Sequence, residues 1–467
     1  PLSGGEWCSM SAPESPRPHG IQEGVRLFLV NETPLGPLYH RFFKRFSVVR
    51  GAVILSWKYV LPLGVMAYAR FSANVRRLPL VKLADLGTTV DEVSPPQQVV
   101  TPAPEVFPVR LAGRCPSPHE AFGFPRLYIT RLQDQLVRGG SNFLLGGDAL
   151  VHHDLFQASH DYTSEELHGH MAIRAKTGKV FVFAASADDV HEEIAEAAVF
   201  TDAVAPNYAH FMTEVLPRLH MFVRHAPAHV PLVIDAALHA NLQAAIRLVA
   251  GEDRPLIRLQ AGQLLRVRDL WVMSVCGYVP FERRPGTARL QDHSQGVFSP
   301  VALQSMRDAI KTSLQVAADA PSGRKVFIRR NSGYRNVINA QEIEDRLVAC
   351  GFEVVEPEKL TFAGQVALFS SAAVVVGATG AAFANLVFCR PDCRVVILIA
   401  ELEGTSYYYW QNIASACGGR VCYVLGQIEE RRFRSIHSDF RVDPDDVLAA
   451  VQGPVADAVR PAGAVRR

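Results

Sequence analysis

The sequence has few cysteines, little net charge and no low-complexity tract long enough to dominate it. Eight cysteines in 467 residues are too few for a disulfide scaffold. Their closest pairs, Cys389/Cys393 and Cys417/Cys422, lack the two-residue spacing of structural zinc sites. A formal net charge of +2 argues against a generic nucleic-acid binder. With no secretory signal visible, we expect reduced thiols in a cytoplasmic protein.

Acidic residues are missing from one long stretch near the N-terminus. Residues 1–20 are rich in proline, serine and glycine and predict a disordered tail. Residues 41–77 hold eight basic residues, interleaved aromatic ones and no acidic one. Lys58 and Pro62 interrupt the apolar run 51–69, which disfavours a membrane-spanning helix. A basic segment lying in an anionic membrane surface and a helical hairpin packed on the body both stay open.

The rest of the chain alternates between strand-like and helix-like segments. A proline-rich stretch, residues 93–125, predicts an extended linker or edge strands. Further strands are predicted at Lys179–Phe183, Val230–Ile234, Leu264–Met273, Lys325–Ile328, Phe352–Val355, Val374–Val376, Arg394–Ile399 and Val421–Leu425. Helices are predicted at Tyr208–His225, Ala236–Val249, Pro300–Val316, Ala340–Cys350, Tyr407–Ala416 and Pro444–Val451. This alternation predicts an α/β fold with doubly wound parallel sheets, whose ligands bind beyond the carboxyl ends of the strands.

The most informative stretch is Val374–Asn385, a β-branched run followed by two glycines. Gly377 and Gly380 allow a turn with positive φ and a close approach of a ligand to the backbone. A helix that starts at Ala381 would aim unpaired N–H groups at one point, which suits a phosphate or pyrophosphate. A tight strand–helix connection without a ligand is the alternative.

Two other groups of residues carry candidate chemistry. Arg329, Arg330 and Arg335 follow a predicted strand and can grip a diphosphate, although a solvated loop has the same composition. After the next strands, Glu401 could accept hydrogen bonds from a ribose.

His210 and Glu214 lie four residues apart, on one face of a predicted helix for which Asn207 is a plausible N-cap. A carboxylate beside an imidazole fixes its tautomer and raises its basicity. An ordinary surface pair is the alternative interpretation.

In their order and spacing, these motifs make residues 200–425 resemble glycosyltransferase family 61. The markers are Asn207-Tyr208-x-His210-Phe211-x-x-Glu214-x-Leu216-Pro217-Arg218-Leu219, Arg329-Arg330…Arg335, Phe352…Val355 with Gln365 and Phe369, and Gly377-x-x-Gly380-Ala381-x-x-x-Asn385-x-x-Phe388. The chain departs from the family at Thr379, where a histidine is usual, and at Ala382, where glycine is common.

The resemblance implies a GT-B architecture, with two Rossmann-like domains facing a cleft. Residues 96–300 would bind the acceptor and residues 301–460 the nucleotide sugar, after an N-terminal segment 21–95. It also implies inversion at the anomeric carbon without a required metal. The absence of a DxD-like motif in a suitable loop agrees with this, because Asp443-Pro444-Asp445-Asp446 is better explained as a helix start.

Roles follow for individual residues from the same resemblance. His210, supported by Glu214, would be the catalytic base, and Asn207 and Tyr208 would contact the acceptor. The donor, expected to be UDP-linked and needing no further cofactor, would be bound by Arg329, Arg330, Arg335, Gly377, Thr379, Gly380, Ala381, Asn385 and Glu401.

The basic segment 41–77 suggests a lipid-linked or polysaccharide acceptor at the inner face of the plasma membrane. Bacterial members of the family often resemble enzymes of capsular or surface polysaccharide synthesis, so the resemblance implies such a bacterial enzyme, cytoplasmic and with peripheral contact to the membrane left open.

Two other functions stay open. Gly377-Ala378-Thr379-Gly380 resembles the start of the NAD(P) fingerprint of a reductase, but Phe383 stands at the third glycine position and no Tyr-x-x-x-Lys pair follows. The second is a non-catalytic sugar- or nucleotide-binding protein on the same fold.

Overall fold

The computed structural model describes most of the chain from residue 75 onward. The described residues are 75–86, 88, 90–114, 121–167, 171–174, 179–183, 190–281, 296–316, 323–332, 335–402, 407–429 and 438–453. The predictions for the tail 1–20, and for most of the N-terminal segment 21–95 with its basic stretch, fall outside these ranges. None of the helices within them is both long enough and apolar enough to cross a bilayer.

The chain divides into two compact units. The first holds residues up to Leu80, Asp148–Leu150 and Thr163–His191. In it the predicted strand Lys179–Phe183 is confirmed as β10, which pairs antiparallel with β1 and β9. Its elements are β1 (Val75–Lys82, which ends in the second unit), α5 (Ser164–Leu167), β9 (Met171–Arg174) and β10 (Lys179–Phe183).

The second unit contains two large sheets, the first of which is mixed. Its strand order is β13-β12-β11-β14-β6-β7, with β2 on β6. The strands are β2 (Val90–Ser94), β6 (Leu127–Arg138), β7 (Leu144–Gly146), β11 (Val190–Val199), β12 (Leu232–Asp235), β13 (Leu256–Leu259) and β14 (Leu264–Met273); β8 (Ala149–His152) crosses the unit boundary.

Only part of this sheet is parallel, against the prediction of a doubly wound parallel sheet. β11, β12 and β13 pair in parallel, whereas β6 pairs antiparallel with β14, β7 and β2. The reason lies in the connection between Leu259 and Leu264, where Gly262 has φ +82°. So short a link cannot carry the chain back across the sheet, as a parallel crossover requires.

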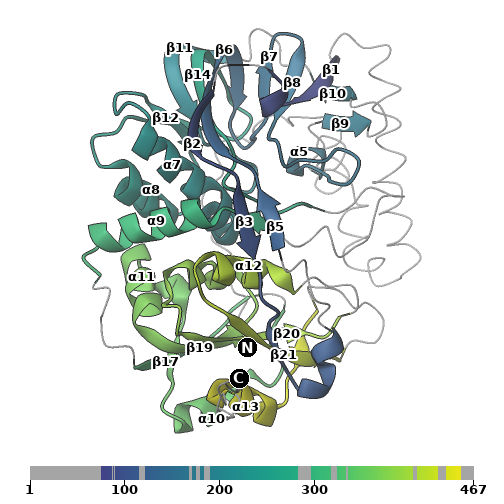
Figure 1. The fold of residues 1–467 in the computed structure, drawn as a ribbon, viewed down its shortest axis with the longest axis vertical. Coiled ribbons are helices and arrows are strands. Elements are labelled where there is room, and N and C mark those ends of the chain that lie inside the picture. Colours follow the sequence, from purple (N-terminus) through teal and green to yellow (C-terminus); the bar gives the residue numbers. More distant parts are fainter. Residues whose placement is uncertain are drawn as a thin grey trace, which may run out of the picture. The chain divides into compact units, whose positions relative to one another are not determined.

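Helices cover this sheet and form the N-terminal lobe with it (Figure 1). The predicted helix Tyr208–His225 is confirmed, but a π-helical turn interrupts it. Gly251, with φ +83°, ends α8 as predicted. The elements are α6 (Tyr208–His210), η7 (the π turn, Phe211–Val215), α7 (Leu216–His225), α8 (Ala240–Ala250) and α9 (Pro300–Ser313).

The second sheet confirms the predicted alternation of the last third and, with its helices, forms the C-terminal lobe. Its strands run in the order β18-β17-β19-β20-β21, and each pair in this series is parallel. The strands are β17 (Arg324–Ile328), β18 (Glu353–Val355), β19 (Ala372–Ala378), β20 (Arg394–Ala400), β21 (Val421–Ile428) and β22 (Phe440–Arg441). The helices are α10 (Ala340–Ala349), α11 (Phe362–Ser371), the 3₁₀ helix η10 (Ala381–Phe388), α12 (Tyr408–Ala416) and α13 (Pro444–Gln452), which Asp443 caps as predicted.

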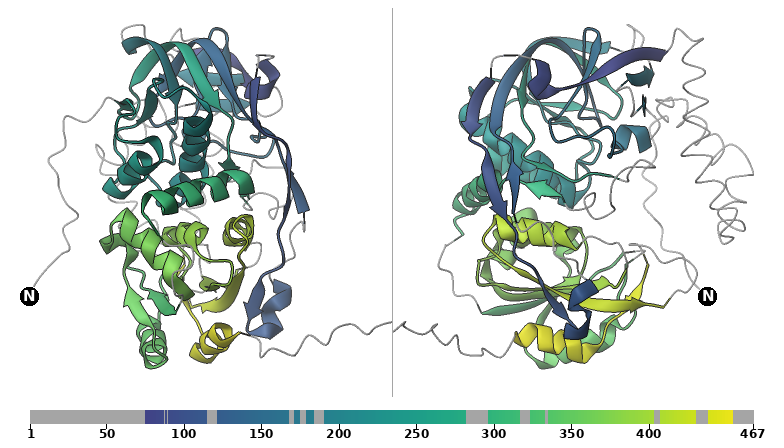
Figure 2. Two further views of the ribbon diagram at one scale, coloured as in Figure 1. Left: turned by 60° about the vertical axis from the view of Figure 1, so that its left-hand side comes forward. Right: turned by 45° about the vertical axis from the view of Figure 1, so that its right-hand side comes forward.

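The proline-rich stretch 93–125 supplies edge strands, as predicted. β3 (Gln97–Val100) pairs antiparallel with β5 (Ala121–Phe124), and β4 (Glu105–Phe107) adds a parallel strand to β21. The guanidinium of Arg394 binds both carboxylate oxygens of Glu105, at 2.8 and 2.7 Å. This segment, dark blue in Figure 2, runs from the first sheet of the unit to the second.

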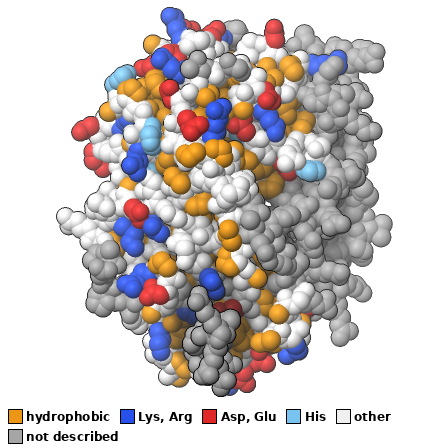
Figure 3. All heavy atoms as spheres, in the orientation of Figure 1, with side chains coloured by type: hydrophobic (Ala, Val, Ile, Leu, Met, Phe, Trp, Pro, Cys, Tyr) orange, Lys and Arg blue, Asp and Glu red, His pale blue; other side chains and the backbone are white. Residues whose placement is uncertain are grey.

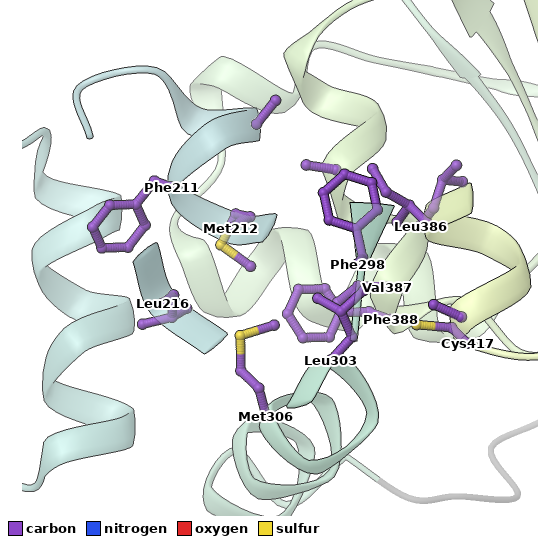
Figure 4. Packing of buried hydrophobic residues seen from close by; sticks show 14 of the residues in the cluster. Phe211, Met212, Leu216, Phe298, Leu303, Met306, Leu386, Val387, Phe388 and Cys417 are labelled. Carbon is purple, nitrogen blue, oxygen red and sulfur yellow. The ribbon is translucent and has the colours of Figure 1, made fainter. Parts of the chain in front are cut away.

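One apolar cluster is shared by helices of both lobes. Met212 of η7 and Met306 of α9 belong to it together with Phe388 of η10, and all three are fully buried. Figure 4 shows these side chains pointing into a common interior. On the face drawn in Figure 3, by contrast, charged side chains of both signs are interspersed. The two lobes are therefore held together by a packed core as well as by the chain.

We predict that Phe388→Ala lowers the free energy of unfolding by about 3–5 kcal/mol, because it opens a cavity among fully buried neighbours. Denaturant unfolding measures this change. The matched control is Val348→Ala on α10, where the side chain is 50% exposed and the expected change stays within about 0.5 kcal/mol. Equal losses in the two variants would contradict the shared core.

Candidate active site

The paired side chains of His210 and Glu214 lie at the start of the α6–η7–α7 helix. The side chain of Asn207 accepts a hydrogen bond from the Ala209 N–H at 3.0 Å, which confirms it as the N-cap. His210 Nδ1 lies 2.7 Å from Glu214 Oε1, and the two side chains are 19% and 11% exposed. Phe281 stacks on the imidazole with ring centroids 6.1 Å apart. The pair is largely buried, so the interpretation as an ordinary surface pair does not describe it.

A π-helical turn, Phe211–Val215, begins directly after His210 and contains Glu214. An inserted residue widens one turn of the helix, and such turns are frequent at functional sites. Burial alone would lower the pKa of His210, but the charge and hydrogen bond of Glu214, with the charge of Asp202, raise it above its usual value. Burial also raises the pKa of Glu214, although His210 opposes this. His210 is thus a stronger base than a free imidazole.

The glycine segment keeps its predicted place but not its predicted backbone conformation. Gly377 is the penultimate residue of β19, and Gly380 has an extended backbone with φ 174°, so neither of them adopts the left-handed conformation. Close contact with a strand neighbour explains Gly377, whereas the atom nearest to a side chain at position 380 is the movable end of an arginine. A Cβ on Gly377 would lie 2.9 Å from the Cβ of Ile328, and one on Gly380 would lie 2.0 Å from Nη1 of Arg330.

The three arginines that follow β17 take different positions. Arg330 lies against Gly380, at the carboxyl ends of the neighbouring strands β17 and β19. Arg329 instead binds Glu344 through Nε at 2.9 Å and through Nη2, and it contacts Glu356 at 3.4 Å. These carboxylates belong to α10 and to the end of β18, on the other side of β17 from β19. The structure therefore brings Arg330 to the glycine segment and holds Arg329 away from it.

The remaining residues predicted for the donor are placed as follows. Arg335 has the left-handed backbone, with φ +59°. The hydroxyl of Thr379 accepts a hydrogen bond from the Trp410 indole at 2.9 Å. Ala381 begins η10, and the N–H of Glu401 donates to the carbonyl of Gly426 at the carboxyl end of β20.

Tyr208 and Asn385, predicted to contact acceptor and donor respectively, bind each other. The Tyr208 hydroxyl donates to Asn385 Oδ1 at 2.7 Å, and the Asn385 amide donates to Gln365 Oε1 at 2.8 Å and to the Ala382 carbonyl at 3.1 Å. Asn385 is completely buried. These contacts connect the helix of His210 directly to the helix that follows the glycine segment.

The predicted site residues leave out several buried polar side chains close to Glu214. Arg218, Asp202 and Asp235 are 8%, 6% and 7% exposed, and the charges of both aspartates and of Glu214 act on the Arg218 guanidinium. Burial raises the pKa of Asp235 to about 6. The sequence signal for Arg218 was its position four residues after Glu214, which itself lies four residues after His210.

Comparison with protein families matches residues 208–396 to the model described as Glycosyltransferase 61. The match begins at Tyr208 and extends past Asn385, so it covers the His210–Glu214 pair and the glycine segment. It confirms the predicted resemblance to this family and indicates a glycosyltransferase. A comparison with curated proteins found no match.

UDP is the donor nucleotide that the family resemblance leads us to expect. We predict that Gly380→Ala weakens its binding about tenfold, because the added methyl group would displace the Arg330 guanidinium and cost a charged hydrogen bond. Isothermal titration calorimetry measures the affinity. Gly323→Ala is the matched control, since a Cβ there meets no described atom within 4 Å. Unchanged UDP affinity in Gly380→Ala would show that Arg330 does not bind the nucleotide.

Proposed function

We propose, on the premise that residues 208–396 belong to glycosyltransferase family 61, that this protein is an inverting, metal-independent glycosyltransferase. It would move a sugar from a nucleotide sugar, UDP-linked in our proposal, to a glycan acceptor. The observation that carries the proposal is the 2.7 Å contact between His210 and Glu214, largely buried beside the core that both lobes share.

In this mechanism His210 acts as the general base. Glu214 holds the Nδ1 proton, which leaves Nε2 as the atom that accepts a proton from the acceptor hydroxyl. The acceptor oxygen attacks the anomeric carbon from the face opposite the leaving group. The bond between that carbon and the diphosphate oxygen breaks, so the sugar is inverted and the nucleoside diphosphate leaves with the bonding electrons.

The leaving diphosphate needs positive charge and N–H donors. Arg330 beside Gly380 and the N-terminus of η10 are the groups we assign to it, with Arg335 on the same loop. Arg329 would have to exchange Glu344 and Glu356 for phosphate oxygens, so we assign it a smaller contribution to diphosphate binding. Thr379 keeps a hydroxyl proton to donate while its oxygen accepts from Trp410.

The GT-B arrangement belongs to the same proposal. From the sequence we expect the division between the two domains at residue 300, but α9 packs on α7 and α8, so we propose the division after α9. The arrangement is supported by a sheet covered by helices in each lobe and by the grouping of the nucleotide candidates on the second sheet. A lipid-linked or polysaccharide acceptor at the inner membrane face, as in bacterial capsule synthesis, is supported by the basic composition of residues 41–77.

We predict that His210→Gln reduces kcat for sugar transfer roughly 10²–10⁴-fold while UDP still binds, because a general base is removed from an otherwise intact site. Release of UDP from a panel of nucleotide sugars measures transfer. His229→Gln, at a side chain that is 72% exposed, is the control and should transfer normally. Transfer that survives in His210→Gln would remove His210 from the role of base.

We also predict a shift of the pH–rate profile in Glu214→Gln. A base works when deprotonated, so the rate should rise with pH through the raised pKa of His210. Loss of the Glu214 charge lowers that pKa, and the acidic limb of kcat/KM should move down by about one pH unit or more. A limb that moves upward or stays in place would contradict the coupling.

A further inference from the structure

The interior of the N-terminal lobe holds polar groups that the proposed transfer does not use. Arg218 on α7 is 8% exposed, and among the described residues its Nε and Nη2 have no hydrogen-bond partner. His152, at the end of β8, and His153 are 5% and 9% exposed, and the Nδ1 atom of each is likewise without a partner in the described part of the chain. Burying such polar groups without hydrogen bonds costs free energy of folding, so this interior points to a ligand.

Nε and Nη2 of Arg218 form the edge of the guanidinium that donates two parallel hydrogen bonds to a pair of oxygens. Other arginines of this chain bind carboxylates through the same edge. Arg324 Nε and Nη2 bind the two oxygens of Glu353 at 2.5 and 2.7 Å, and Arg390 binds those of Asp392 at 2.9 and 3.1 Å. Arg218 thus presents a two-oxygen receptor that is buried and that no described side chain fills.

The two imidazoles lie close to this receptor. The His152 and His153 rings are 4.0 Å apart between centroids, and His153 packs edge-on against Tyr278 at 4.5 Å. Burial lowers the pKa of both histidines. The charges of His153, Arg218 and Lys82 add to this for His152, and those of Arg218 and Lys82 add to it for His153, whose pKa falls to about 3. Both rings are therefore neutral near pH 7 and can each donate or accept one hydrogen bond.

Charge decides which kind of oxygen fits. The carboxylates of Asp202 and Asp235 act on Arg218, but their oxygens already accept from the N–H groups of Val204, Asp202 and Gly140 and from the Asn142 amide. With Glu214, they equal in number the cations Arg218, protonated His210 and Lys82, whose charge also acts on both histidines. The site therefore has no excess positive charge to attract a further full anion, whereas neutral hydroxyl oxygens need none.

We propose that Arg218, His152 and His153 form a subsite for two neighbouring hydroxyl groups of a neutral sugar in the acceptor. Arg218 donates to both oxygens, and the Nδ1 atoms of the histidines exchange hydrogen bonds with the hydroxyl groups. The assignment to the acceptor rests on the proposed function, because Arg218 lies on the same helix as His210, two turns further along.

Saturation-transfer NMR on the whole chain tests this with D-glucose, D-galactose, D-mannose and D-xylose, against D-glucuronate and inorganic phosphate. We expect at least one neutral sugar to bind. Arg218→Lys keeps the charge but loses the two-donor geometry, and it should weaken that binding about tenfold or more. Arg390→Lys removes the same geometry from a surface pair and should bind the sugar normally.

UDP binding, followed in parallel, separates the two proposals. Failure of the wild-type protein to bind UDP contradicts the proposed function, whereas sugar binding that ignores Arg218→Lys contradicts the subsite alone. Tighter binding of glucuronate or phosphate than of every neutral sugar, or no sugar binding at all, also overturns the subsite. A wild-type crystal soaked in the sugar needs no substitution: sugar oxygens on Nε and Nη2 support the subsite, and water alone there overturns it.

Discussion

The hydrogen bond between Tyr208 and Asn385 is the constraint on which the geometry of the candidate site depends. It joins the first turn of the helix that carries His210 to the 3₁₀ helix that follows Gly380. Asn385 is completely buried and its amide nitrogen also binds Gln365, so loss of the Tyr208 contact would leave the buried Asn385 Oδ1 without this donor. Together with the shared apolar core, this network fixes the base relative to the strand ends without relying on loops.

Two neighbouring arginines of the C-terminal lobe, Arg329 and Arg330, have different surroundings. Arg329 forms ion pairs with Glu344 and Glu356, which tie the end of β17 to α10 and β18. Arg330, one residue later, lies across the next strand beside Gly380. Since side chains alternate along an extended backbone, neighbouring arginines face different partners. A side chain at position 380 would make the Arg330 guanidinium move, and the N–H groups of η10 begin at the same place.

The N-terminal lobe buries several charged groups and carries others on its surface. Asp202, Asp235 and Arg218 are all buried beneath the His210–Glu214 pair. The hydrogen bonds from backbone N–H groups to the aspartates reduce the cost of burying them. The same low-polarity surroundings strengthen the effect of Glu214 on His210, which gives a base whose pKa is raised even though burial opposes it.

Local patterns in the sequence determined the α/β alternation and the strands Lys179–Phe183 and Leu264–Met273. They also determined the helix caps Asn207 and Asp443 and the spacing of His210 and Glu214. The reason is that propensity, periodicity and capping act within a few residues. The tertiary structure alone decided that the first sheet is mixed, that Arg330 rather than Arg329 reaches Gly380, and that Tyr208 binds Asn385. That last pair is separated by 177 residues, and no local pattern encodes which distant side chain will meet a given polar atom. The buried donors of Arg218 were hidden from the sequence for the same reason, since whether a hydrogen bond is made depends on everything packed around it.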